Sequence, residues 1–265
     1  MHLKRLIVAA VLLPVIYLYI MYLPSGYFLF LLAAVSFFAM SEFYSMYRAS
    51  GILRYTCLLF GVSIISVSYF SKDLLSDVII LFVMAVIVIR LLVKRNPISS
   101  LYDISPLILG LLYIPGCLAF QTQIRNLGPE WIIFLYASVW TSDTMAYYLG
   151  IWIGKKKLYI EVSPNKTVAG AAGSLMGGII AALLLRATII PLLTLYPAVL
   201  IGIIIGVISI VGDLVESMFK RDAGVKDSGI IIPGHGGILD KIDGVLFAGP
   251  MLYWMLTVMG IIKGS

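Results

Sequence analysis

The chain alternates between long apolar runs and short polar connections. Nine apolar runs can be counted, at roughly residues 6–23, 27–47, 52–70, 74–93, 104–121, 131–150, 168–189, 193–212 and 245–262. A helix of about 20 apolar residues crosses a hydrocarbon core about 30 Å thick. The pattern therefore predicts an all-α, polytopic integral membrane protein with about nine transmembrane helices.

Composition supports this class. Of the 265 residues, 61% are hydrophobic and 12% are charged, whereas soluble domains carry about 25% charged residues. No linker or low-complexity segment interrupts the chain, so we expect one integral membrane domain over residues 1–265. Within it, we expect residues 1–125 to form mainly scaffold spans, and residues 126–265, where polar residues return, to be the half that carries any catalytic site.

The distribution of positive charge predicts the orientation. If the N-terminus lies inside, 14 of the 19 Lys and Arg residues fall on inner segments and four on outer ones. Such a bias predicts that the N-terminus and the polar stretch at residues 209–244, described next, lie on the cytoplasmic side of a cell (inner) membrane. The net charge of +6 then reflects topology and attraction to the lipid bilayer, and we expect no nucleic-acid binding.

One polar stretch, residues 209–244, stands out. It holds six of the 13 acidic residues, namely Asp213, Glu216, Asp222, Asp227, Asp240 and Asp243, with Lys220, Arg221, Lys226 and Lys241 between them. Ionisable groups beside apolar spans are costly to place, so their presence indicates function. The stretch is therefore the first candidate for a site.

The spacing in this stretch predicts how its side chains are grouped. Asp213, Glu216, Ser217 and Lys220 lie on one face of a helix, because they are three, four and seven residues apart. The eighth span should therefore continue beyond Asp213. Asp240 and Asp243, three residues apart, should also be neighbours on a helix.

A glycine-rich loop separates these two helical segments. It reads Pro233-Gly234-His235-Gly236-Gly237, and its glycines allow backbone N–H groups to approach an anion. Carboxylates able to hold a divalent cation, basic side chains and such a loop are the components of a phosphoryl- or nucleotidyl-transfer site.

These residues resemble a known family. The run Ser217-x-x-Lys220-Arg221-x-x-x-x-Lys226-Asp227, then Pro233-Gly-His235-Gly-Gly and Asp240-Lys241-x-Asp243, is similar to the hallmark of phosphatidate cytidylyltransferases. The resemblance implies an enzyme of phospholipid biosynthesis that joins CTP and phosphatidic acid, with Mg²⁺, into CDP-diacylglycerol and pyrophosphate. It also implies a homodimer.

On this interpretation the candidate residues take separate roles. We expect Asp213 and Asp240 to be the principal Mg²⁺ ligands, with Asp243 nearby and Glu216 and Asp143 as weaker candidates, Asp143 for a second cation. Phosphate contacts are expected from Lys166, Lys220, Arg221, Lys226, Gly234, His235, Gly236 and Gly237. Ser217, Asp227 and Glu216 would orient these groups, and Lys241 would supply charge between Asp240 and Asp243. Phosphatidic acid would enter laterally from the inner leaflet.

The chain departs from the family pattern at Ala169 and Lys241. Ala169 stands where a glutamate is usual after Ser163-Pro164-Asn165-Lys166-Thr167, and Lys241 stands where arginine is usual. Two other functions stay open: a different CTP-using lipid enzyme such as a polyprenol kinase, and a secondary transporter of an anionic substrate.

Two features outside the motif also carry expectations. Glu42 is the one acid in the interior of the first five spans rather than in their first turns, and we expect it to be partnered or interfacial. Small residues recur every fourth position in the seventh and eighth spans, as in Gly170, Ser174 and Gly178. Such spacing favours close helix packing, within the chain or in a dimer.

Overall fold

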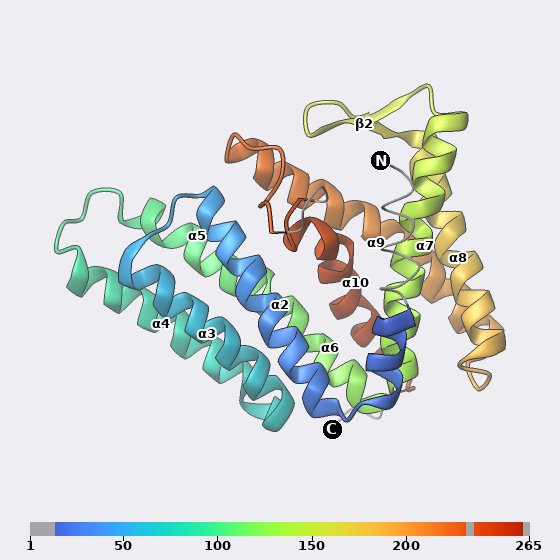
Figure 1. Ribbon diagram of the computed structural model, residues 1–265, viewed down its shortest axis with the longest axis horizontal. Coiled ribbons are helices and arrows are strands. Elements are labelled where there is room, and N and C mark those ends of the chain that lie inside the picture. The colour runs from blue at the N-terminus through green and yellow to red at the C-terminus, as the bar shows by residue number, and fades with distance from the viewer. Residues whose placement is uncertain (1–13, 232–235, 262–265) are drawn as a thin grey trace.

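Helices dominate the computed structural model, which describes residues 14–231 and 236–261 (Figure 1). Residues 14–22 are helical, and the helices that follow are α2 (Ser25–Met46), α3 (Gly51–Phe70), η1 (Lys72–Leu74), α4 (Leu75–Val93), α5 (Ser100–Tyr113), α6 (Pro115–Leu127), α7 (Pro129–Trp152), α8 (Val168–Thr188), α9 (Leu195–Asp222) and α10 (Leu239–Val258). Two short strands, β1 (Lys157–Tyr159) and β2 (Ser163–Thr167), stand between α7 and α8.

The class of membrane protein is confirmed, but the count of nine spans is not. In the described part of the chain, six helical segments are long and apolar enough to cross a membrane: α2, α3, η1 with α4, α5 with α6, α8 and α9. The helices α7 and α10 match the sixth and ninth apolar runs but fall outside these six. Residues 6–13 of the first run lie outside the described residues.

The fifth predicted span is divided into two helices. We expected one helix over 104–121, whereas α5 ends at Tyr113 and α6 begins at Pro115. Proline has no backbone N–H, and its ring clashes with the preceding turn of a helix, so it is tolerated best at a helix start. The proline therefore explains the break.

Arg90, near the end of α4, is buried. It is 5% exposed although it carries a positive charge. Its guanidinium contacts Asp103 at 3.0 Å and donates to the carbonyl of Ile98 at 2.9 Å. The arginine therefore closes the α4–α5 connection through a buried ion pair.

The helices pack as a continuous series across the molecule. The helix α7 packs on α8, α8 on α9, and α9 on α10, which reaches α6; α6 then contacts α3, and α3 contacts α2 and α4. In Figure 1, α3 and α4 lie on one side, α7 and α8 on the other, and α2, α6 and α10 between them. The buried apolar residues form one core through both halves.

Small residues of α8 explain its close contacts with two neighbours. A Cβ atom added at Gly178 would lie 2.3 Å from the carbonyl oxygen of Gly202 in α9, and one added at Gly177 would lie 2.7 Å from that of Thr141 in α7. Ser174 donates to the carbonyl of Gly206 at 2.8 Å. These small residues of α8 are thus used within the chain: Ser174 and Gly178 face α9, and Gly177 faces α7.

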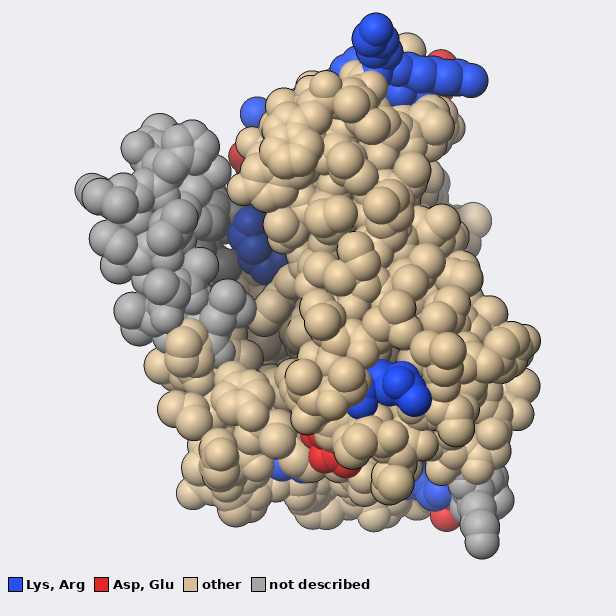
Figure 2. All heavy atoms as spheres, turned by 90° about the vertical axis from the view of Figure 1, so that its right-hand side faces the viewer, with Lys and Arg blue, Asp and Glu red and all other residues tan. Residues whose placement is uncertain are grey.

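The connection between α7 and α8 is a β-hairpin that the apolar pattern did not predict. β1 and β2 pair antiparallel, with Lys157 opposite Thr167 and Tyr159 opposite Ser163. Figure 2 shows basic side chains gathered at one end of the molecule above a largely uncharged face, and the exposed Lys155, Lys156 and Lys157 belong to this hairpin region. In Figure 1 it lies at the same end as the junction of α9 and α10.

Candidate active site

The site is built where the end of α9 meets the start of α10. The helix α9 continues to Asp222, which confirms that the eighth span extends beyond Asp213. Gly212 allows the close approach, because a Cβ atom there would lie 2.5 Å from the carbonyl oxygen of Asp243. Glycine at this position therefore brings the carboxylates of the two helices together.

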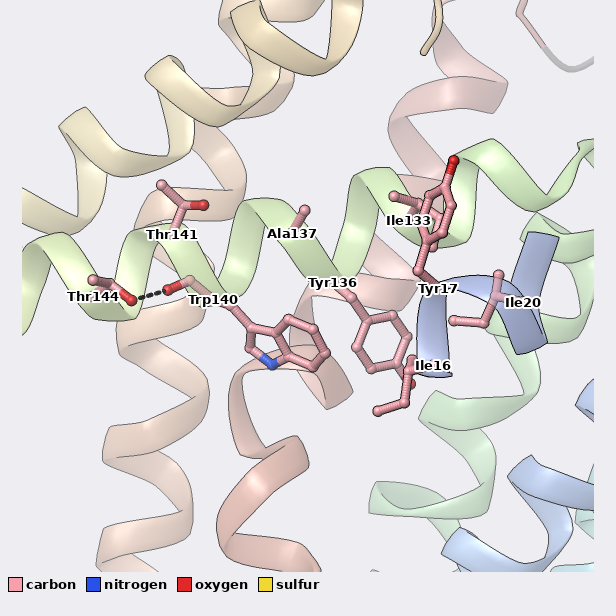
Figure 3. Close-up of a pocket in the computed structure, with 9 residues that line it drawn as sticks. All are labelled: Ile16, Tyr17, Ile20, Ile133, Tyr136, Ala137, Trp140, Thr141 and Thr144. Atoms are coloured by element: carbon pink, nitrogen blue, oxygen red, sulfur yellow. Dashed lines mark hydrogen bonds between the residues drawn. The ribbon is translucent and has the colours of Figure 1, made fainter. Parts of the chain in front are cut away.

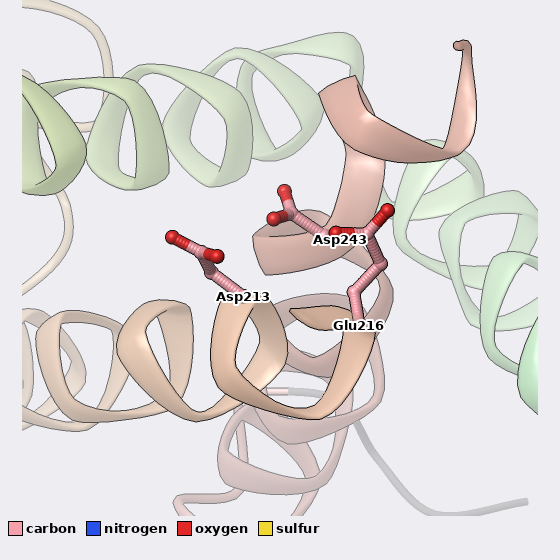
Figure 4. A group of neighbouring side chains, drawn as sticks. All are labelled: Asp213, Glu216 and Asp243. Carbon is pink, nitrogen blue, oxygen red and sulfur yellow. The ribbon is translucent and has the colours of Figure 1, made fainter. Parts of the chain in front are cut away.

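Three carboxylates form the centre of the site. One oxygen from each of Asp213, Glu216 and Asp243 lies within 4.8 Å of the others, and Figure 4 shows the three side chains converging from α9 and α10. Glu216 is 1% exposed, and its Oε1 atom has no hydrogen-bond partner among the described residues. We refer to these three residues as the acidic group.

Like charges this close repel one another, and burial increases the cost of their ionisation. Oxygen ligands are those that Mg²⁺ prefers, usually one or two carboxylates together with water and substrate phosphates. The oxygen-only donor set and the unpartnered buried Oε1 atom of Glu216 therefore fit a divalent cation. The acidic group is the best candidate metal site in the described residues.

A lysine from the opposite side reaches the acidic group. Lys166 in β2 places its Nζ atom 2.6 Å from Oδ2 of Asp213. The local fold explains its position, because Thr167 caps α8 by accepting from the N–H of Gly170 at 3.0 Å. The end of β2 is thereby held beside α7 and α9.

Asp240 does not join the acidic group, in contrast to the expected pairing with Asp213. Its Oδ1 atom accepts from Lys220 Nζ at 2.6 Å. Its Oδ2 atom accepts from the N–H of Ser228 at 3.1 Å, the Ser228 hydroxyl at 3.0 Å and the N–H of Gly237 at 2.8 Å. We call these four residues, Asp240, Lys220, Ser228 and Gly237, the Asp240 arm.

Lys220 connects the arm to the acidic group. Its ammonium group forms ion pairs with both Glu216 and Asp240, and the residue is 9% exposed. The predicted helix face is therefore present, but its lysine is buried between two carboxylates. A buried ammonium with two anionic partners is a fixed charge that holds α9 to α10.

Asp143 approaches the site from α7. Its Oδ1 atom accepts from the hydroxyl of the buried Ser209 at 2.7 Å. Ser217, which also lies on the predicted helix face, donates to Oδ1 of Asp213 at 3.3 Å. These hydroxyl groups orient acidic side chains that would otherwise be free to rotate.

A cavity of about 660 Å³ opens over these groups. Its polar lining includes Asp143, Lys157, Lys166, Asp213, Asp240 and Asp243. Pockets of about 300–1,000 Å³ are typical of small-molecule sites. Because acids and amines converge here, the cavity is suited to a polyanion accompanied by a metal ion.

Several predicted site residues lie away from this cavity. The guanidinium of Arg221 donates to the carbonyls of Val162 and Val225, at 3.4 and 3.0 Å. Lys226, Asp227 and Lys241 are exposed and do not line the cavity. Gly236 has a positive φ of 85°, and a Cβ atom added there would lie 2.6 Å from Oδ2 of Asp240. Gly234 and His235 lie outside the described residues.

Three contributing residues were not among the predicted site residues. Ser209 and Ser228 bind carboxylates of the site, and the Ser228 hydroxyl also lies 3.1 Å from Oε2 of Glu42 in α2. Glu42 is also 5% exposed, so the expectation of a partnered acid is confirmed. The signal in the sequence was its isolation among apolar spans.

A second cavity, of about 380 Å³, lies between residues 14–22 and α7 (Figure 3). Its lining is mostly apolar and includes Ile16, Ile20, Ile133 and Trp140. Two of its hydroxyl groups are already bonded: Tyr136 donates to Gln121 at 2.9 Å, and Thr144 donates to the carbonyl of Trp140 at 2.7 Å. This cavity therefore suits hydrocarbon.

Comparison with known proteins agrees with the geometry. Residues 3–259 match the model of the cytidylyltransferase family. A phosphatidate cytidylyltransferase of Bacillus subtilis (strain 168) is 34% identical over 96% of this chain and 98% of its own length. One from Synechocystis sp. is 33% identical over 89% of this chain and 90% of its own length. One from Staphylococcus saprophyticus is 40% identical over 59% of this chain and 60% of its own length.

Proposed function

The chain belongs to the cytidylyltransferase family, and from this premise we propose that it converts CTP and phosphatidic acid into CDP-diacylglycerol and pyrophosphate. The observation that carries the proposal is the acidic group at the side of a cavity of about 660 Å³ that lysines also line. This arrangement suits a reaction between two phosphate-bearing substrates.

The chemistry requires positioning more than a strong base. An oxygen of the phosphatidate phosphate, already anionic, bonds to the α-phosphorus of CTP. The bond from that phosphorus to the oxygen bridging to the β-phosphate breaks, and pyrophosphate leaves with the electron pair. The obstacle is repulsion between two polyanions, which fixed cationic groups reduce.

The residues of the chain divide this task. Lys166 and Lys157 line the cavity and are placed to neutralise substrate phosphates. Lys220 is buried between Glu216 and Asp240, and we assign it to holding the acidic group in place. Asp143, oriented by Ser209, is the candidate for a second cation.

The acidic group is the proposed Mg²⁺ site. Asp213 and Asp243, with Glu216 behind them, would hold the ion. When bound, Mg²⁺ would neutralise phosphate charge and orient phosphate oxygens. Asp240 is reassigned from principal ligand to support, because Lys220, Ser228 and Gly237 already bond to its oxygens.

The apolar cavity is the proposed location of an acyl chain. Residues 133, 137, 140, 141 and 144 of α7 line it, and residues 143, 147 and 151 line the polar cavity. Spacings of three and four residues place 137, 140, 144, 147 and 151 along one continuous helix face. A lipid with its phosphate near Lys166 could therefore extend its hydrocarbon along α7.

Chain length tests this location. Replacement of Ala137 by Trp would fill the apolar cavity. We expect a higher KM for a long-chain phosphatidate and little change in the KM for a six-carbon-chain phosphatidate or for CTP. Equal effects on both lipids would place the acyl chain elsewhere.

We further propose that the site faces the cytoplasm of the inner membrane, with the N-terminus inside, and that the enzyme is a homodimer. Positive charge favours the orientation. A cysteine replacing the exposed Lys226 should react with an impermeant thiol reagent only after cells are opened. Light scattering in detergent should give the mass of two chains.

The position of a radioactive label tests the reaction itself. Purified protein is incubated with phosphatidate and Mg²⁺ and with CTP labelled at either the α- or the γ-phosphate. We expect α-label in the lipid fraction and γ-label in pyrophosphate. Transfer of γ-label to lipid would instead identify a kinase, the alternative that the sequence leaves open.

A further inference from the structure

Glu42 lies in the half of the chain that was expected to be scaffold, yet it contacts the site. It is near the end of α2 and 5% exposed. Its Oε1 atom accepts from the N–H of Ile238 at 2.9 Å, and its Oε2 atom accepts from the N–H of Leu239 at 2.9 Å. These two donors are separated from Glu42 by 196 and 197 residues.

The contact completes the start of α10. The first N–H groups of a helix have no partner within the helix, and a side chain at the N-cap usually supplies one. The N-cap residue of α10 is Ile238, which makes no side-chain capping bond. Glu42 therefore acts as the cap from a distant helix, and its charge is favoured by the positive end of the helix dipole.

The space around Glu42 is shaped to its carboxylate. A Cβ atom added at Gly229 would lie 2.7 Å from Oε1, and one added at Gly237 would lie 2.4 Å from Oε2. Among the described residues, no lysine or arginine forms an ion pair with Glu42. Its partners are backbone N–H groups and the Ser228 hydroxyl, which require correct geometry rather than charge alone.

Ser228 links Glu42 to the Asp240 arm. The Ser228 hydroxyl lies 3.1 Å from Oε2 of Glu42 and 3.0 Å from Oδ2 of Asp240. Asp240 in turn accepts from Lys220, which contacts Glu216 of the acidic group. A continuous series of contacts therefore leads from α2 to the proposed metal site.

A second contact holds the same end of α2 to α9. Tyr47 follows the last residue of α2, and its hydroxyl donates to Oδ2 of Asp222 at 3.0 Å. Burial, together with this hydrogen bond, raises the pKa of Tyr47, so the hydroxyl stays a donor. The rings of Phe43 and Phe219 pack edge to face, 5.5 Å apart. The end of α2 thus contacts both helices that carry the acidic group.

We propose that Glu42 is a positioning residue for the reaction: through Ser228 and the start of α10, it fixes the Asp240 arm and thereby the acidic group. The inference rests on the proposed function. It assigns to α2 a role in the site that neither the motif nor the spacing of the polar stretch indicated.

Glu42→Gln is the test variant, because glutamine keeps the shape but has one acceptor oxygen and places an amide donor against a backbone N–H. We expect kcat to fall about tenfold or more, as for a small displacement of reacting groups, while the KM for phosphatidate changes little. Ser36→Ala is the matched control. Ser36 is also buried on α2 and contacts Met40 rather than the site, so its kcat should be nearly unchanged.

Hydrogen–deuterium exchange gives a second measurement that does not depend on activity. In Glu42→Gln, the amides of Ile238 and Leu239 should exchange faster than in the wild type and in Ser36→Ala, while the amides of α3 should not change. If Glu42→Gln fails to fold, Ser228→Ala replaces it and should produce a smaller change in the same direction.

The outcomes separate the two proposals. If the wild type makes no CDP-diacylglycerol, the proposed function fails, and the exchange measurement still decides whether Glu42 holds α10. If the wild type is active and Glu42→Gln matches Ser36→Ala in kcat and in exchange, the positioning role is refuted. Loss of kcat that merely follows a loss of thermal stability, with unchanged exchange, also refutes it.

Discussion

The acidic group and the Asp240 arm contain the same kind of side chain in very different surroundings. Asp240 and Asp243 are one turn apart on α10. Asp240 accepts hydrogen bonds from Lys220, Ser228 and Gly237, whereas Asp243 accepts from the N–H of Gly244 at 2.8 Å. Satisfied acceptors suit a structural role, and under-satisfied carboxylates that face one another suit a cation. Nearby donors, rather than spacing, therefore distinguish the proposed metal ligands from the proposed support.

The largest effect is expected in the acidic group. Asp243→Asn and Asp213→Asn should each reduce kcat by at least about 10²–10³-fold, the range seen when a main electrostatic contact is lost. The thermal midpoint should not fall, because one of three mutually repelling charges is removed. Assays at saturating Mg²⁺ and CTP measure this effect, with the exposed Glu161→Gln as control. Near-normal turnover in either variant would remove that residue from the proposed metal site.

A smaller loss of activity, with a loss of stability, is expected in the arm. Asp240→Asn leaves Lys220 with one anionic partner and weakens the contacts to Ser228 and Gly237. We expect stability to fall by about 1–3 kcal/mol and kcat to fall less than in Asp243→Asn. Thermal unfolding in detergent and steady-state kinetics measure both. A variant as stable as wild type and fully inactive would contradict the supporting role.

A smaller effect, on substrate binding rather than on kcat, is expected at Lys166. Replacement by methionine removes the ammonium that contacts Asp213 at 2.6 Å and lines the cavity. We expect the KM for CTP or phosphatidate to rise about tenfold, equivalent to about 1.4 kcal/mol of binding, with kcat less affected. Measuring the KM for CTP and the KM for phosphatidate separately shows which substrate's phosphate Lys166 contacts. Unchanged KM values for both substrates would mean that Lys166 serves only Asp213.

The smallest effect is expected at Lys241, where the chain departs from the family pattern. Lys241 is exposed and does not line the cavity. We expect Lys241→Arg to change kcat/KM by less than about twofold, in line with the small effects of surface substitutions. Steady-state kinetics on this variant measure the effect. A large gain would show that a planar, two-pronged phosphate contact is missing from this protein.

Much of the fold could be predicted from local pattern. Apolar runs located the helices, and the polar face at Asp213, Glu216 and Lys220 predicted the continuation of α9 to Asp222. These succeeded because helical periodicity is a local property. Pro115 was a local signal for a helix start, but it lies inside an apolar run that we interpreted as a single helix.

The grouping of the site residues could not be predicted in the same way. Asp240 and Asp243 follow the same spacing rule, and only the position of Ser228, Gly237 and Lys220 in space separates them. Glu42 meets Ile238 across 196 residues, a contact that periodicity in a single sequence does not encode. The proposed roles therefore depend on long-range contacts, whereas the helices themselves follow from local pattern.

Metal binding measured without turnover tests the central claim most directly. Electron paramagnetic resonance can follow the binding of Mn²⁺, used as a probe for the Mg²⁺ site, to the purified wild type, Asp243→Asn and Asp240→Asn in detergent. We predict that Asp243→Asn loses the tight site and that Asp240→Asn keeps it with affinity near that of the wild type. Retained binding in Asp243→Asn with loss in Asp240→Asn would contradict the assignment and return Asp240 to the metal.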